Sequence, residues 1–101
     1  MSKAKTKPFD PAEYLDDSES IAAYMSDALE SEDPKFVADA LGVVARARGM
    51  SEVAREAGVS RESLYRSLST DGNPEFATVL RVIRALGLRL SAAPIKQKKL
   101  A

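Results

Sequence analysis

Apolar residues recur at helical spacing in five stretches of this chain, and helix-starting and helix-stopping residues separate the stretches. The pattern predicts helices over residues 19–30, 34–48, 51–57, 61–68 and 74–86. The expected buried sides are Ile21, Met25, Ala28 and Leu29; Phe36, Val37, Ala40, Leu41, Val44 and Ala47; Val53, Ala54 and Ala57; Leu64 and Leu68; and Phe76, Val79, Leu80, Ile83 and Leu86, with Tyr24 at the edge of the first set. Residues 88–92 alternate between apolar and polar, which predicts a short strand. The chain is therefore expected to be all-α, with one short C-terminal strand.

The ends of the predicted helices carry the residues that commonly start and stop them. The expected N-caps are Ser18, Asp33, Ser60 and Asn73. Prolines at 34 and 74 suit the first helical position, and glycines at 49, 58 and 87 are expected to end helices. The acidic pairs at 16–17 and 32–33 have the residue types of a metal site or a hydrolase, but capping and the helix dipole account for both pairs.

Residues 51–68 organise the rest of the chain, because two short helices meet there at a glycine turn. Gly58 stands where the chain must take a left-handed conformation, which glycine adopts without a steric penalty. Val59 is expected to fill the corner, and Ala54 is small enough to let the two helices cross closely. A helix-turn-helix of this kind lays its second helix in the major groove of DNA. The alternative is an ordinary helical hairpin with a glycine corner.

The second helix of this motif carries polar residues suited to DNA recognition. The expected DNA-binding residues are Ser51, Ser60, Arg61, Glu62, Ser63, Tyr65, Arg66 and Arg48. Arg61 and Glu62 begin the helix and are the expected base readers, because arginine can hold guanine with two hydrogen bonds and glutamate can accept from cytosine. The alternative is that Glu62 and Arg66 form a surface pair four residues apart. Four further arginines contact the DNA backbone or belong to a solvated face: Arg46, Arg55, Arg81 and Arg84.

Charge is divided between two halves of a chain of 101 residues whose formal net charge is zero. Residues 1–41 hold four lysines against ten acids, a net charge of −6, and residues 42–101 hold eight arginines and three lysines against five acids, a net charge of +6. A basic half can face phosphates while an acidic half faces a basic partner or the solvent. We divide the chain into an extended, proline-punctuated N-terminal arm (1–17), a helix-turn-helix domain (18–93) and a basic tail (94–101).

Composition argues against several other functions. The chain has no cysteine and no histidine, which removes thiol chemistry, the usual metal ligand and the usual general base. We therefore predict no catalytic residue, no metal site and no cofactor. No apolar run approaches the roughly 20 residues that span a bilayer, and no signal core follows the N-terminal lysines. The expected location is the cytoplasm, without membrane contact.

Seven segments carry a resemblance to a known family, at residues 8–15, 21–24, 40–42, 45–50, 58–65, 72–74 and 85–90. The most specific are Pro-Phe-Asp-Pro-Ala-Glu-Tyr-Leu in the arm and Ser-Arg-Glu-Ser-Leu-Tyr at the start of the second motif helix. The chain resembles the addiction-module antidote proteins, which are antitoxins with a Cro-like helix-turn-helix encoded beside a RelE/ParE-type toxin. Met50 departs from many Cro-like domains, where a glutamine donates to a phosphate, so that contact must come from Ser51 or a backbone N–H, or be absent.

The resemblance implies a five-helix Cro-like fold and a non-enzymatic protein that neutralises its toxin and represses its own operon. The implied partners are double-stranded operator DNA, a cognate RelE/ParE-type toxin and a second copy of the chain. Because such toxins are basic, we expect the toxin on the acidic arm and first helix, at Phe9, Asp10, Tyr14, Leu15, Asp16 and Asp17. A homodimer is expected through the last helix and residues 88–92, because one recognition helix buries little surface.

Three alternatives stay open. The arm could pack only on its own domain, the chain could be a phage- or plasmid-type repressor without a toxin partner, or it could be an interaction module that has lost DNA binding.

Overall fold

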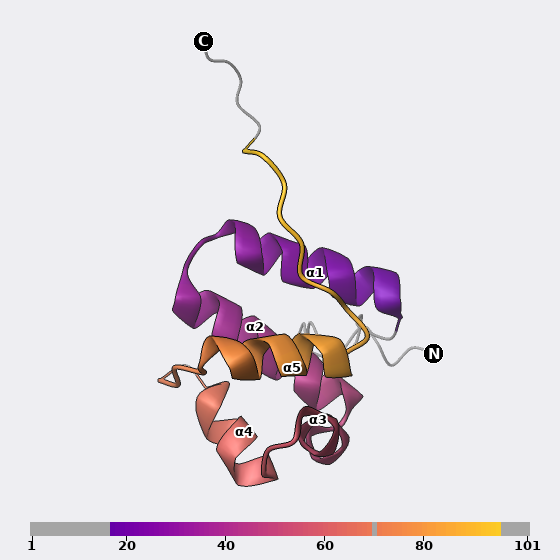
Figure 1. Ribbon diagram of the computed structural model, residues 1–101, viewed down its shortest axis with the longest axis vertical. Coiled ribbons are helices and arrows are strands. Elements are labelled where there is room, and N and C mark those ends of the chain that lie inside the picture. Colours follow the sequence, from indigo (N-terminus) through magenta and orange to yellow (C-terminus); the bar gives the residue numbers. More distant parts are fainter. Residues whose placement is uncertain (1–16, 70, 96–101) are drawn as a thin grey trace, which may run out of the picture.

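The computed structural model describes residues 17–69 and 71–95 of the chain (Figure 1). These residues form five helices: α1 (Ser18–Glu30), α2 (Pro34–Arg48), α3 (Met50–Ala57), α4 (Arg61–Ser67) and α5 (Phe76–Ala85). The all-α, five-helix prediction is confirmed. The arm through residue 16 and the tail from residue 96 lie outside the described residues.

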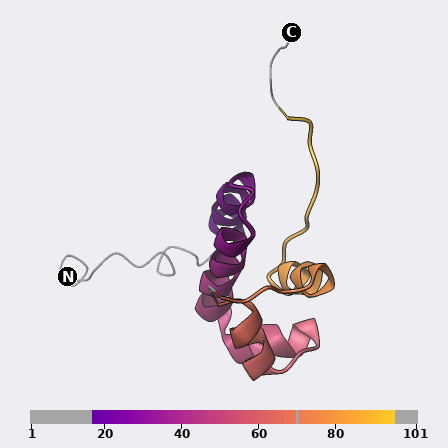
Figure 2. The ribbon, with the colours of Figure 1, turned by 90° about the vertical axis from the view of Figure 1, so that its left-hand side faces the viewer.

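The helices pack around one core. α1 packs on α2, α3 packs on α2 and α4, and α5 packs mainly on α3 and also on α2. In both ribbon views α1 lies at one end of the molecule and the α3–α4 pair at the other (Figures 1 and 2). The buried side chains that meet are Ile21, Met25, Ala28, Ala40, Leu41, Val44, Ala45, Met50, Val53, Ala54, Ala57, Leu64, Leu68, Val82, Ile83 and Leu86. Every helix contributes to this core, so the orientation of α4 depends on the packing of the whole domain.

The predicted N-caps agree with the structure at α2 and α4 and differ from it at α1 and α5. Asp33 Oδ1 accepts from the Lys35 N–H, with Pro34 opening α2, as predicted. α1, in contrast, is capped by Asp17 rather than Ser18, because the Ser20 N–H donates to Asp17 Oδ1 at an N···O distance of 2.7 Å. These hydrogen bonds from Ser20 lower the pKa of Asp17 below its usual value of 3.8.

The prediction that Asn73 and Pro74 start the last helix was wrong. α5 begins two residues later, at Phe76, with Glu75 as an N-cap that makes no side-chain hydrogen bond. On the core side, Val82 and Ile83 of α5 and Leu86 at its C-cap are buried, and Val79 is partly buried. Phe76 and Leu80, predicted to point inward, lie on an adjacent row and are 67% and 43% exposed.

A similar correction applies to α2, where Phe36 and Ala47 are exposed although they were placed on the buried side. The face that packs is made of smaller residues: Ala38, Ala40, Leu41, Gly42, Val44 and Ala45. Small side chains let α2 approach its neighbours closely, so the larger Phe36 is left at the periphery.

The predicted strand at 88–92 is not seen, and the described residues contain no strand. The Leu88 N–H donates instead to Ile83 O, at 3.0 Å, in the turn that follows α5. Leu88 and Leu90 then pack against the core while Arg89 is exposed. The alternation of apolar and polar residues reflects an extended segment with one side on the core. Among the described residues no neighbouring strand is available to pair with it in a ladder.

Candidate nucleic-acid interface

The junction of α3 and α4 is a tight turn built by Gly58. Its φ of 76° and ψ of 29° are left-handed, as the sequence predicted. The Val59 N–H donates to Ala54 O at 3.0 Å and the Gly58 N–H donates to Arg55 O at 3.2 Å. These two bonds are the Schellman pattern, which satisfies the last carbonyls of a helix. The chain thereby reverses within three residues and starts α4.

The inner side of the turn is closed by small and apolar residues. Ala54 and Leu64 are buried, and Val59 is partly buried and packs on the core. Ala54 lies in α3, which packs against α4, so a larger side chain at this position would wedge the two helices apart. The predicted roles of these three residues agree with their packing.

The start of α4 is capped by Ser60, whose Oγ accepts from the Ser63 N–H at 3.0 Å. Arg61, Glu62, Tyr65 and Arg66 follow and are all exposed. The structure therefore brings four of the eight predicted DNA-binding residues together on the exposed surface of α4. Ser63, on the same helix, is only partly exposed.

Arg61 and Tyr65 contact one another on this side of α4. The Arg61 guanidinium lies over the Tyr65 ring, 5.4 Å from its centre. Such a contact is worth about 0.5–1 kcal/mol at an exposed site, and here it restrains the Arg61 side chain beside Tyr65, which lies four residues later on the helix. Arg61 is thus partly ordered before it meets any ligand.

The far end of α4 is fixed by two glycines whose role the sequence analysis did not identify. A Cβ on Gly72 would lie 2.2 Å from Ser67 O and 2.4 Å from Arg66 O, so the loop after α4 presses directly on the helix backbone. A Cβ on Gly42 would lie 2.7 Å from Leu68 O, so α2 approaches the same end equally closely. The signal for Gly42 was a glycine inside an otherwise apolar helical pattern, which usually has a packing reason.

Two arginines that were candidates for DNA contact, Arg48 and Arg81, form hydrogen bonds inside the domain. Arg81 Nε donates to Ala57 O at 3.0 Å and so joins α5 to the end of α3. Arg48 Nη2 donates to Leu86 O at 3.4 Å, which directs this side chain toward the end of α5. Arg48 is exposed, but its recorded contact is with α5 and not with the α4 residues.

The start of α3 has no side-chain cap. Gly49 precedes it with no side-chain hydrogen bond to the first turn, and Met50 is buried in the core. Ser51 and Glu52 are exposed. The first-turn N–H groups of a helix lack intrahelical partners and favour anions, so this end can meet a phosphate through backbone donors and the Ser51 hydroxyl.

The exposed surface at the opposite end of the domain is acidic. Glu19, Asp27 and Glu30 are exposed on α1, and that helix contains no lysine or arginine. Asp17, the one predicted toxin-binding residue inside the described range, is exposed and already accepts the capping bond at the start of α1. Phe9, Asp10, Tyr14, Leu15 and Asp16 lie outside the described residues.

Neither a metal-binding cluster nor a membrane-spanning helix is found among the described residues. No group of three or more carboxylates there is arranged to hold a metal ion. None of the five helices is long and apolar enough to cross a membrane.

Comparison with known proteins agrees with the sequence resemblance. Residues 5–94 match a family described as "Probable addiction module antidote protein". The chain belongs to this family. An uncharacterized protein of Haemophilus influenzae is 49% identical over 83 residues, which cover 82% of this chain and 86% of that protein. No solved structure gives a significant match to the chain.

Proposed function

We propose that this antidote-family protein is a DNA-binding antitoxin, which neutralises a RelE/ParE-type toxin and represses its own operon from the cytoplasm. The observation that carries the DNA-binding part is the α3–Gly58–α4 unit. Its inner side is buried and its outer side presents Arg61, Glu62, Tyr65 and Arg66 together. An exposed helix with polar residues such as Arg61 and Glu62 at its N-terminal end suits the major groove, where such side chains reach base edges.

The family assignment supports a regulatory protein that needs neither a cofactor nor a catalytic residue. Neutralisation needs a partner, and the family description implies a toxin. The proposed site for the toxin is the arm together with the acidic surface of α1, because acidic residues steer a basic partner and buried aromatic anchors hold it. α1 lies at the opposite end from α4, which favours binding of toxin and DNA at the same time (Figure 1).

The DNA-binding proposal is tested by gel-shift and selection of random sequences, beginning with the DNA upstream of the gene. We expect a salt-sensitive complex on an inverted repeat with half-site centres about one helical turn apart. Arg61→Ala should relax base preference at one position in each half-site. Lys35→Ala is the matched control, because it removes an exposed positive charge at the start of α2. Absence of any preferred sequence for the intact chain would contradict DNA recognition, and equal weakening on every sequence by Arg61→Ala would remove Arg61 from base reading.

The toxin proposal is tested with a deletion that ends at residue 16. Asp17 must stay, because its carboxylate caps α1. The truncated protein should unfold cooperatively and still bind operator DNA while losing toxin binding, measured by calorimetry. Tyr14→Ala in the intact chain should weaken toxin binding with little change in folding. Full neutralisation by the truncated protein would refute the proposed toxin site.

A further inference from the structure

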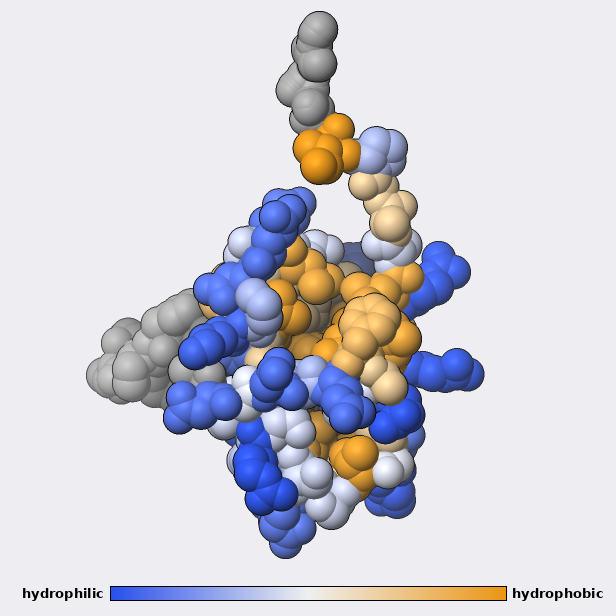
Figure 3. Space-filling view, turned by 60° about the vertical axis from the view of Figure 1, so that its left-hand side comes forward, coloured by the Kyte–Doolittle hydropathy of each residue, from blue (hydrophilic) through white to orange (hydrophobic). Residues whose placement is uncertain are grey.

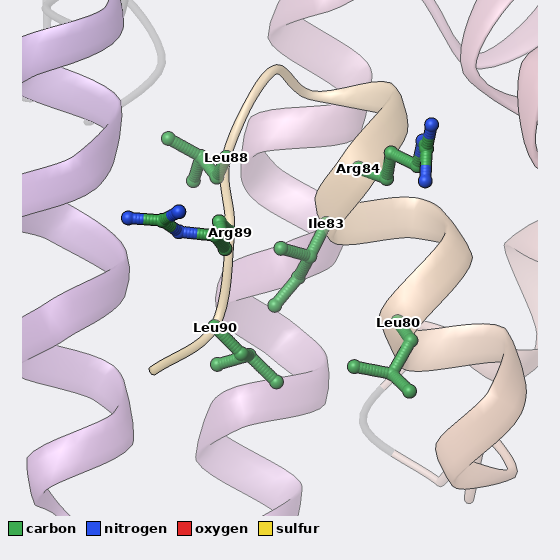
Figure 4. Close-up of a pocket in the computed structure, with 6 residues that line it drawn as sticks. All are labelled: Leu80, Ile83, Arg84, Leu88, Arg89 and Leu90. Carbon is green, nitrogen blue, oxygen red and sulfur yellow. The ribbon is translucent and has the colours of Figure 1, made fainter. Parts of the chain in front are cut away.

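Tyr65 is an exposed aromatic residue on a helix surface that is otherwise polar. Its side chain is 42% exposed. The apolar surface of the domain lies elsewhere, at a cleft of about 420 Å³ between α5 and the segment at 88–90 that has Leu80 and Ile83 in its lining (Figure 4). Figure 3 shows apolar side chains gathered in a hollow with charged residues around it. Tyr65 belongs neither to the lining of the cleft nor to the hydrophobic core, and its ring contacts the Arg61 guanidinium instead.

We propose that Tyr65 is a positioning residue, whose ring holds the Arg61 guanidinium ready to bind guanine. The inference rests on the proposed DNA-binding function and deepens it in two respects. It names guanine as the base that Arg61 reads. It also makes the preference for that base depend on Tyr65, which acts through Arg61 and makes no base contact of its own.

The contact restrains Arg61 without occupying its hydrogen-bond donors. The guanidinium carbon of Arg61 lies 5.4 Å from the centre of the Tyr65 ring, so the ring face attracts the cation. A guanidinium carries its five N–H donors in its own plane, and contact with a ring face needs none of them. Two N–H groups therefore stay free to donate to O6 and N7 of one guanine. A carboxylate would also restrain an arginine, but a bidentate ion pair would occupy two of the same donors.

The position of the pair on α4 suits this role. Arg61 is the first residue of α4, and residues at the N-terminal end of a recognition helix meet base edges. Helical side chains lean toward the N-terminus and residues four apart are neighbours, so the ring of Tyr65 lies behind Arg61. A positive charge in the first turn of a helix is disfavoured by the helix dipole. An arginine at this position is therefore better explained by recognition than by folding.

The role of the ring is tested with the DNA sequence that the intact chain selects and with variants of that sequence changed at single positions. Arg61→Ala identifies the guanine that Arg61 reads, as the position at which base preference is lost. Tyr65→Ala should lower the preference for guanine at that position by about fivefold and leave the other positions unchanged, because the free Arg61 side chain must then be ordered on binding. Tyr65→Phe keeps the ring and should keep the preference. Phe36→Ala is the matched control, because Phe36 is also an exposed aromatic residue but lies on α2.

Several results would contradict the positioning role. They are an unchanged preference in Tyr65→Ala, a preference of Arg61 for a base other than guanine, and an equal loss at every position, which would indicate a change in α4 itself. Loss of the preference in Tyr65→Phe would assign the effect to the hydroxyl and overturn the inference as well. A variant with both Arg61→Ala and Tyr65→Ala should show the base preference of Arg61→Ala, since the ring acts only through the arginine. A further loss in the double variant would show that Tyr65 contacts DNA by itself and would overturn its role as a positioning residue.

NMR of the free protein tests the contact in the absence of DNA. The ring current of Tyr65 should shift the side-chain protons of Arg61 in the parent and in Tyr65→Phe, and this shift should disappear in Tyr65→Ala. Backbone amide spectra and thermal unfolding check that Tyr65→Ala keeps its fold, which is expected because Tyr65 lies outside the core. Arg61 protons with the same shifts in the parent and in Tyr65→Ala would overturn the inference.

These measurements separate the inference from the proposed function. A parent protein that selects no DNA sequence would contradict the proposed function and, with it, the reading of guanine by Arg61. A parent protein that selects a sequence, with a preference unaffected by Tyr65→Ala, would overturn the positioning role alone and leave the DNA-binding proposal standing.

Discussion

Gly58 and Gly72 stand on either side of α4 and should respond to substitution for different reasons. Gly58 has a left-handed backbone with open space where a Cβ would lie. At Gly72 the constraint is space, because a Cβ there would overlap two backbone oxygens of α4. Alanine and asparagine substitutions at both positions can separate these two causes.

The expected magnitudes follow from each cause. A left-handed alanine costs about 1–2 kcal/mol, and the reduced freedom of the unfolded chain offsets about 0.4–1 kcal/mol of it. Gly58→Ala should therefore lower the free energy of unfolding by about 1 kcal/mol, and Gly58→Asn by less, because asparagine tolerates this conformation. Gly72→Ala should lower it by about 1–3 kcal/mol through overpacking, and Gly72→Asn by at least as much.

Urea and thermal unfolding measure these differences. A loss of 1 kcal/mol lowers the melting temperature of a domain of this size by about 4–8 °C. The decisive comparison is the order of alanine and asparagine at each position. Equal destabilisation by the two residues at Gly58 would contradict the conformational explanation, and a stable Gly72→Ala variant would show that the loop is not pressed against α4.

Three further substitutions test single contacts. Asp17→Asn keeps a capping oxygen for Ser20 but removes the charge. Because folding lowers the pKa of Asp17, its carboxylate contributes to the free energy of unfolding above pH 3.8, and this contribution is lost as pH falls through the folded pKa. The urea midpoint of the variant should thus fall less on acidification than that of the parent. Equal falls would show that Asp17 does not contribute to the pH dependence of stability. Arg81→Ala should lower the free energy of unfolding by about 1 kcal/mol by removing the bond to Ala57, and an unchanged urea midpoint would show that this bond adds nothing. Arg48→Ala removes only the long contact to Leu86 and should cost under about 0.5 kcal/mol, so any uniform loss of DNA affinity in a gel-shift would report a phosphate contact.

The sequence was sufficient to predict α3, α4 and the tight turn between them because its signals there are local. The left-handed backbone at Gly58 and the N-cap at Ser60 each depend only on residues within about four positions of them in the chain. Asp33 and Pro34 predicted the start of α2 for the same reason.

The errors came from interactions between distant segments. Asn73 and Pro74 have the residue types of a helix start, but α5 begins at Phe76, after a loop that lies against α4 at Gly72. The inward placement of Phe76 and Leu80 failed because helical periodicity cannot tell a row that meets the core from the row beside it. Gly42 inside an apolar helical pattern indicated a close approach, but its partner, Leu68, lies far away in the chain and has no local signal.

If the protein binds DNA as proposed, the acidic surface of α1 at the end opposite α4 affects how the molecule approaches the duplex. With a net charge of zero, the whole molecule feels no net pull from a distant phosphate backbone, but its separated charges feel a torque. This torque turns the arginine-bearing end toward the duplex during rotational diffusion. At physiological salt, screening acts over about 8 Å, so DNA that touches α4 meets Arg61 and Arg66 without the opposing field of α1. In the proposed complex, DNA that meets the α1 end would instead be repelled at contact, which would shorten unproductive encounters.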